Sequence, residues 1–107
     1  MASKCCKVCA LIWTYNPTSH LLEEVVKAAS ENVDYVLIVD NGSENSEVIE
    51  RLRSDKVDIL HLPRNLGVEA INIGLDVLTA RSTCEWILIL DDDSIVAKPN
   101  AVREVLR

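Results

Sequence analysis

The sequence predicts an α/β fold: a Rossmann-like three-layer sandwich built on a mainly parallel sheet. Three observations support this prediction, namely four apolar runs of strand length, apolar residues at helical spacing between them, and short connections. Strands that alternate with helices form parallel sheets with helices on both faces and right-handed crossovers. The 107 residues are sufficient for one domain, and we expect residues 1–107 to form it.

The four expected strands are short and apolar, and turn-forming or charged residues follow them. They are residues 8–13, 35–39, 57–62 and 86–90. The last run has no polar alternation, which is typical of a strand buried on both faces. As the final strand of the sheet, it is also a potential exposed edge.

Three helices are expected between these strands, because apolar residues recur there at three- and four-residue spacing. The recurring positions are Leu21, Leu22, Val25, Val26 and Ala29, then Val48, Ile49 and Leu52, then Val68, Ile71, Leu75 and Leu78. Turns at residues 41–43 and 65–67 open the second and third helices. Pro99 suits the first turn of a fourth helix that runs to the last residue.

The composition excludes several classes of protein. A formal net charge of −6 argues against nucleic-acid binding, because no block of Lys and Arg is present to neutralise phosphates. The longest apolar run is far shorter than the roughly 20 residues of a transmembrane helix. No secretory signal peptide is recognisable at the N-terminus. We therefore expect a cytoplasmic protein.

The four cysteines are interpreted as ordinary thiols in a reducing compartment. They are Cys5, Cys6, Cys9 and Cys84. Cys6 and Cys9 have the spacing of a redox pair or of half a zinc site. No second pair of ligands at zinc-site spacing accompanies them.

Three carboxylates, Asp91, Asp92 and Asp93, directly follow the last apolar run. Two like charges about 4 Å apart repel by about 4 kcal/mol at an effective dielectric of about 20. Such a cluster is therefore either a solvated turn or a cation site. Alternate residues of an extended chain share a face, so Asp91 and Asp93 can converge while Asp92 points away. Carboxylate oxygens suit Mg²⁺ or Mn²⁺.

Other polar residues are expected along the same edge, because the carboxyl ends of parallel strands lie together and open α/β sheets bind ligands there. They are Thr14, Tyr15, Asp40 and Arg64. Tyr15 offers a ring for base stacking, Asp40 an acceptor for a base or ribose, and Arg64 a partner for phosphate. Each residue alone is explained by packing, turn formation or solvation. Together they favour a nucleotide site.

Four segments carry a resemblance to a known family. They are Ala10-Leu-Ile-Trp-Thr-Tyr-Asn16, Val36-Leu-Ile-Val-Asp-Asn-Gly-Ser43, Asn65-Leu-Gly-Val-Glu-Ala-Ile-Asn-Ile-Gly74 and Trp86-Ile-Leu-Ile-Leu-Asp-Asp-Asp-Ser94. In this order and spacing they resemble the N-terminal, donor-binding half of family 2 inverting glycosyltransferases, which have a GT-A fold. The residues of these motifs most resemble the rhamnosyltransferase-like branch. The resemblance covers about residues 8 to 105.

The resemblance implies roles for the residues at the base and helix side of the site. Thr14 and Tyr15 would line the nucleobase pocket, and Asp40 would accept a hydrogen bond from the base. Gly67 and Asn72 would belong to the segment where a helix passes close under the nucleotide. Arg64 is the nearest candidate for a phosphate contact.

The resemblance also assigns the aspartates. Asp91 and Asp93 match the Asp-x-Asp pair that binds the metal, and Asp91 and Asp92 are expected at the nucleotide. The implied cofactor is Mg²⁺ or Mn²⁺, which would stabilise the departing diphosphate.

The implied reaction transfers a sugar from a UDP- or dTDP-sugar donor to a hydroxyl of a saccharide or lipid-linked acceptor, with inversion. A general base must deprotonate that hydroxyl. In the family the base is an Asp or Glu well downstream of Asp-x-Asp, on the acceptor-binding half. The sequence ends at Arg107, so we expect no catalytic residue here and no transfer by this chain alone. The full-length form could be membrane-peripheral.

Three alternatives compete with this interpretation, and the sequence disfavours the first two. A sugar-phosphate nucleotidyltransferase would carry a Gly-rich loop with a basic residue where this chain has residues 14–17. A phosphoryl-transfer enzyme would use the aspartates around Mg²⁺ but would also need a lysine and a Ser or Thr after another strand. A non-catalytic nucleotide-sugar-binding module, or a subunit that needs a partner chain, is the third.

Overall fold

The computed structural model describes residues 7–81 and 84–92. Four strands, β1 (Val8–Thr14), β2 (Tyr35–Asp40), β3 (Val57–His61) and β4 (Trp86–Asp91), form one sheet in the order β3-β2-β1-β4. All three pairings are parallel. The predicted parallel sheet is therefore confirmed. The helix expected after Pro99 lies outside the described residues.

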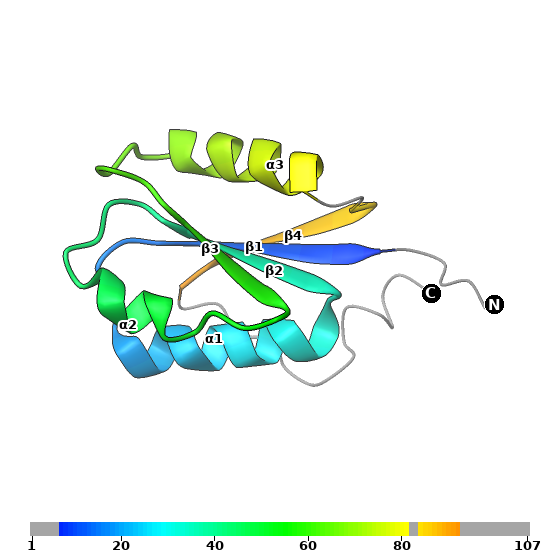
Figure 1. Ribbon diagram of the computed structural model, residues 1–107, viewed down its shortest axis with the longest axis horizontal. Helices are drawn as coiled ribbons and strands as arrows, with labels where there is room; N and C mark the ends of the chain where they lie inside the picture. The colour runs from blue at the N-terminus through cyan, green and yellow to red at the C-terminus, as the bar shows by residue number, and fades with distance from the viewer. Residues whose placement is uncertain (1–6, 82–83, 93–107) are drawn as a thin grey trace.

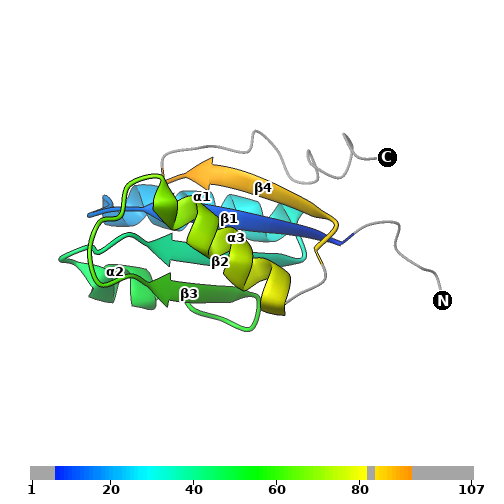
Figure 2. The ribbon, with the colours of Figure 1, turned by 90° about the horizontal axis from the view of Figure 1, so that it is seen from above.

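Helices cover both faces of the sheet. α1 (Ser19–Asn32) and α2 (Ser46–Glu50) lie on one face, and α3 (Glu69–Arg81) lies on the other (Figure 1). Figure 2 shows α3 running diagonally over the sheet, with β3 and β4 at opposite edges. This arrangement is the three-layer sandwich that the sequence predicts.

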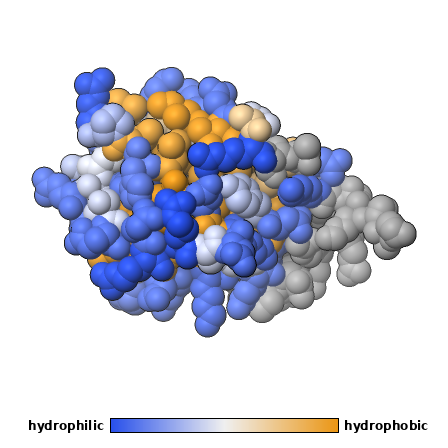
Figure 3. Space-filling model, in the orientation of Figure 1, coloured by the Kyte–Doolittle hydropathy of each residue, from blue (hydrophilic) through white to orange (hydrophobic). Residues whose placement is uncertain are grey.

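Alternation along the strands divides the interior into two cores. Ala10 and Ile12 of β1 pack with α1 and α2, whereas Leu11 packs with α3, and all three are fully buried. Figure 3, viewed as Figure 1, shows mostly hydrophilic residues and a hydrophobic band in its upper part. The two central strands, β1 and β2, contribute buried residues to both cores and are therefore buried on both faces, as continuous apolar runs predict.

The prediction that the last apolar run is buried on both faces is wrong. β4 pairs only with β1 among the described strands, and Trp86 and Ile89 are 53% and 45% exposed. Leu88 and Leu90 pack against the core beneath α1, and Ile87 packs against the core beneath α3. β4 is partly exposed because it lies at the edge of the sheet. This position confirms the expectation of an edge strand.

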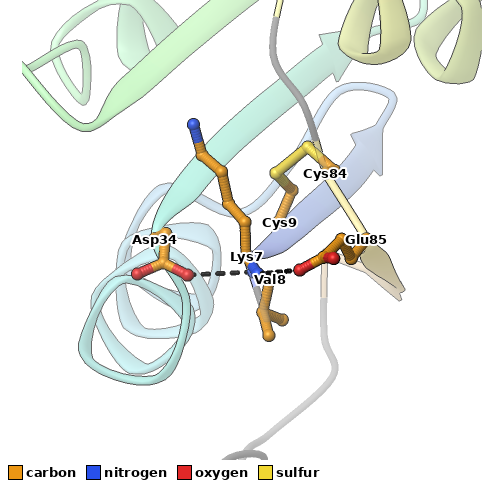
Figure 4. Close-up of a disulfide and its surroundings, with 6 residues drawn as sticks. All are labelled: Lys7, Val8, Cys9, Asp34, Cys84 and Glu85. Carbon is orange, nitrogen blue, oxygen red and sulfur yellow. Dashed lines mark hydrogen bonds between the residues drawn. A yellow bond between two sulfur atoms is a disulfide. The ribbon is translucent and has the colours of Figure 1, made fainter. Parts of the chain in front are cut away.

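The prediction of free thiols is wrong for two cysteines. Cys9, in β1, and Cys84, which precedes β4, form a disulfide with a Cα–Cα distance of 5.8 Å (Figure 4). Beside it, the Lys7 amide donates to Glu85 Oε1 and the Val8 amide donates to Asp34 Oδ2, each over 2.9 Å. The starts of β1 and β4 are therefore joined covalently. Cys5 and Cys6 lie outside the described residues.

Candidate functional site

The four strands end in a row of polar residues. Thr14, Asp40, His61 and Asp91 are the last residues of β1, β2, β3 and β4. The strand register pairs Thr14 with Asp40 and Asp40 with His61, so these three stand side by side across the sheet. Thr14, Asp40 and Asp91 were expected to follow directly after their strands. The parallel pairing of each of these strands extends one residue further than expected and includes them.

A cavity of about 260 Å³ opens between the ends of β1 and β4. Its lining residues are Trp13, Thr14, Tyr15, Asp91 and Asp92. The Tyr15 residue is 46% exposed, which leaves much of its surface available to a ligand. Four of the residues predicted for a nucleotide site therefore share one cavity.

A hydrogen bond crosses this cavity. The Thr14 hydroxyl, which is nearly fully buried, donates to Asp92 Oδ2 over 2.8 Å. Asp91 stands opposite Trp13 in the strand register. Asp91 and Asp92 both line the cavity, and Asp92 is the carboxylate directed at Thr14, so the expectation that Asp92 points away from the site is wrong. The reason is that β4 ends at Asp91, and Asp92 is already in the turn that follows the strand. Asp93 lies outside the described residues.

Asp40 is buried and both of its carboxylate oxygens have protein partners. Oδ1 accepts a hydrogen bond from the Ser43 amide over 2.8 Å, and Oδ2 lies 2.7 Å from His61 Nδ1. The other ring nitrogen, His61 Nε2, lies 2.6 Å from Glu50 Oε1 of α2. The polar row therefore continues from the sheet edge into α2.

The charges in this part of the row stabilise one another. Partial burial lowers the pKa of His61, but its hydrogen bonds to Glu50 and Asp40 raise the pKa by more, so the net shift is upward. Hydrogen bonds from Arg53 and then from His61 lower the pKa of Glu50 to about 2. A protonated imidazole between two carboxylates is the state that this arrangement favours.

The loop that carries Arg64 and Gly67 is attached to the end of β2 by Asn41. This side chain is buried; its Oδ1 accepts from the Leu66 amide over 2.8 Å, and its Nδ2 donates to Asn65 Oδ1 and the Gly67 carbonyl. Gly42 follows with φ +81°, and a Cβ atom there would overlap the backbone of Arg64. The two loops therefore pack closely at the sheet edge.

Arg64, Gly67 and Asn72 are exposed and are not among the residues that line the cavity. Arg64 and Gly67 lie on the loop before α3, and Asn72 lies in its first turns. Gly74 explains why α3 approaches the sheet so closely, since a Cβ atom there would lie 2.7 Å from Leu11 Cδ1 and Val39 Cγ2. The structure thus places these three predicted residues near the same sheet edge but outside the cavity.

Comparison with known families identifies the family of this chain. The family model described as Glycosyl transferase family 2 matches residues 9–107, which include all four strands but the first residue of β1. The chain belongs to this family. A search of curated proteins found no match. Membership of a glycosyltransferase family supports a nucleotide-sugar donor and an acceptor as partners.

No helix within residues 7–81 and 84–92 combines the length and the apolar character needed to cross a bilayer.

Sequence reasoning missed His61, Glu50 and Asn41 in this candidate site. His61 ends β3 just as Asp40 ends β2, but it falls inside the strand that was expected at residues 57–62. Because only the residues after the expected strands were compared as site candidates, His61 was passed over. Glu50 and Asn41 gave no such signal, because their partners are 11 and 24 or more residues away.

The donors at the cavity fit the metal expected of a glycosyltransferase. Asp91 and Asp92 supply carboxylate oxygens, and Mg²⁺ is commonly bound by one or two carboxylates together with substrate phosphates and water. No group of three His, Cys, Asp or Glu suited to a metal occurs in the part of the chain that the structure describes. Ligand phosphates, water or Asp93 would have to complete the coordination.

Proposed function

We propose that this chain is the donor-binding part of an inverting glycosyltransferase and binds a nucleoside diphosphate sugar at the cavity between β1 and β4. The observation that carries the proposal is the shared cavity, where Thr14 and Tyr15 of one strand end meet Asp91 and Asp92 of another. The family match supports it. We also propose UDP- or dTDP-sugar as the donor and membership of the rhamnosyltransferase-like branch.

The base side of the proposed site consists of Tyr15, which lines the cavity, and Asp40, which lies outside its lining but beside Thr14 in the strand register. An exposed tyrosine ring suits stacking on a base, and a carboxylate suits the imide N–H of uracil or thymine. Asp40 already accepts from Ser43 and contacts His61. A carboxylate has about four lone-pair sites, so Asp40 has capacity for one more donor.

The phosphate side consists of the aspartates. Asp91 and Asp93 would bind Mg²⁺ or Mn²⁺, which supplies positive charge for the departing diphosphate. Thr14 orients Asp92 by the 2.8 Å hydrogen bond, which fixes this carboxylate beside the cavity. Transfer with inversion requires the acceptor hydroxyl, from a saccharide or lipid-linked acceptor, to lose its proton to a general base as it attacks.

Calorimetric titration of the 107-residue chain with UDP, dTDP and GDP, each with and without Mn²⁺, tests this proposal. We expect Mn²⁺-dependent binding of one of the nucleotides. Asp91→Asn and Asp93→Asn should each abolish the Mn²⁺-dependent part, because they remove a charged oxygen ligand. Asp55→Asn, at an exposed residue in the turn before β3, is the matched control and should bind as the unmodified chain does. Equal and metal-independent binding by all variants would contradict the proposal.

A further inference from the structure

His61 lies between two carboxylates that come from different elements. Nδ1 is 2.7 Å from Asp40 Oδ2 of β2, and Nε2 is 2.6 Å from Glu50 Oε1 of α2. The first distance is at the short end of the range of charge-assisted N–H···O hydrogen bonds, and the second is slightly below it. A neutral imidazole has one N–H and one lone pair, so it can donate to only one of the two carboxylates. Both contacts are therefore satisfied together only when His61 is protonated.

The position of this imidazolium is determined by the fold. His61 is the register partner of Asp40 in the β2–β3 ladder, and their side chains lie on the face covered by α1 and α2. Asp40 is only 2% exposed, so its carboxylate has little bulk water to replace a lost partner. Loss of the His61 proton would leave a buried carboxylate facing a lone pair or would break the contact to Glu50.

We propose that His61 is a positioning residue for the donor site: its protonated ring fixes the Asp40 carboxylate for base recognition and makes donor affinity fall as the pH rises. This inference rests on the proposed function, because it requires Asp40 to bind the base. Two effects act in the same direction. Deprotonation frees Asp40 from its fixed geometry, and it also removes a positive charge near an anionic ligand.

Solvent and other charges reach His61 from the α2 side. A second cavity, of about 420 Å³, is lined by Ser46, Glu47, Glu50, Arg51 and His61. Arg53 donates to Glu50 over 2.5 Å. The acidic groups favour the imidazolium and the arginines oppose it. The raised pKa of His61 agrees with the dominance of its two direct carboxylate contacts. The open cavity allows the ring to exchange its proton with water.

The test measures two quantities across the same pH range. The pKa of His61 is measured by NMR of the imidazole C–H groups. The affinity for UDP-glucose or dTDP-glucose, whichever binds more tightly, is measured by calorimetry with Mg²⁺ from about pH 5 to about pH 8.5. The diphosphate of such a sugar ester has no proton that titrates in this range. We expect affinity to fall about tenfold between the pKa of His61 in the free chain and its pKa in the complex, which a tenfold preference places about one unit higher.

Three variants separate positioning from folding. His61→Gln should bind the donor with the low affinity, because its neutral amide carries no positive charge. This affinity should be the same at every pH, because the amide has no proton to lose. Glu50→Gln should lower both the pKa of His61 and the midpoint of the affinity profile, with the low-pH affinity retained. His20→Gln is the matched control, since His20 is the chain's other histidine and is exposed on α1. It should leave the profile unchanged.

The outcomes distinguish this inference from the proposed function. Donor binding that is independent of pH, or tight binding by His61→Gln, would overturn the role of His61 while the donor site stands. Absence of donor binding at every pH would overturn both. If His61→Gln does not fold, Glu50→Gln decides the question, because a midpoint that fails to move with the pKa of His61 refutes the proposal.

Discussion

Thr14 and Asp92 show how a single hydrogen bond connects the two strands that form the cavity. Thr14 is the buried last residue of β1, and Asp92 is the first residue after β4. The hydroxyl neutralises none of the charge of Asp92 but fixes its direction over 2.8 Å. Removing one partner of such a bond leaves the other group partly desolvated and without its hydrogen bond, which costs free energy. The orientation of the Asp92 carboxylate should therefore depend on the Thr14 hydroxyl.

Thr14→Val replaces the hydroxyl by a methyl group of similar size. We expect the free energy of unfolding to fall by about 1 kcal/mol and donor affinity to fall about fivefold, because Asp92 loses its donor. Chemical denaturation and calorimetry measure the two effects. Thr14→Ser retains the hydroxyl and should keep affinity within about twofold of the unmodified chain. Equal donor affinity in Thr14→Val and Thr14→Ser would show that this hydrogen bond does not serve the site.

At the scale of elements, β4 depends on its attachment to β1. β4 is an edge strand with two large, exposed apolar residues, Trp86 and Ile89. The disulfide between Cys9 and Cys84 joins it to β1 at the end opposite the cavity. The Glu85 carboxylate reinforces this joint by accepting from the Lys7 amide. The register that places Asp91 opposite Trp13 therefore has a covalent as well as a hydrogen-bonded basis.

Cys84→Ser, or reduction of the unmodified chain, should lower the free energy of unfolding by roughly 2–4 kcal/mol, because the bond closes a loop with a sequence separation of 75. Denaturation with and without reductant measures the effect. Reductant should change the stability of the unmodified chain but not that of Cys84→Ser.

Peptide mapping without reduction provides the direct check of this disulfide. We expect the peptide that contains Cys9 to be recovered linked to the peptide that contains Cys84. Recovery of Cys84 as a separately alkylated thiol would contradict the structure. Disulfides are rare in the cytosol, so the same experiment on protein from its natural source tests the predicted cytoplasmic location.

At the scale of the whole molecule, periodicity was sufficient to predict the alternation of strands and helices and hence the parallel sheet. The rule that strand ends share an edge also predicted that Thr14, Tyr15 and Asp91 meet, whereas the alternation of an extended chain wrongly directed Asp92 away from them. What periodicity does not contain is the order of the strands. Whether β4 is central or at an edge decides its exposure, and that depends on packing between distant segments.

The same limit explains the residues that sequence reasoning missed. The contact between Asp40 and His61 follows from the register of β2 and β3, and the disulfide follows from the pairing of β1 and β4. Neither leaves a local signal in the sequence. The turn at residues 41–43 was recognisable, but Asn41 also attaches a second loop, which only the tertiary arrangement reveals.

The proposed donor site lies where β1 and β4 end. Amide chemical-shift mapping of the ¹⁵N-labelled chain with a UDP- or dTDP-sugar and Mg²⁺ is the direct test of its position. We expect the largest shifts at Thr14, Tyr15, Asp91 and Asp92, smaller ones at Asp40 and His61, and none near Cys9 and Cys84. Shifts concentrated at the disulfide end of the sheet, or on the outer face of α3, would contradict this position.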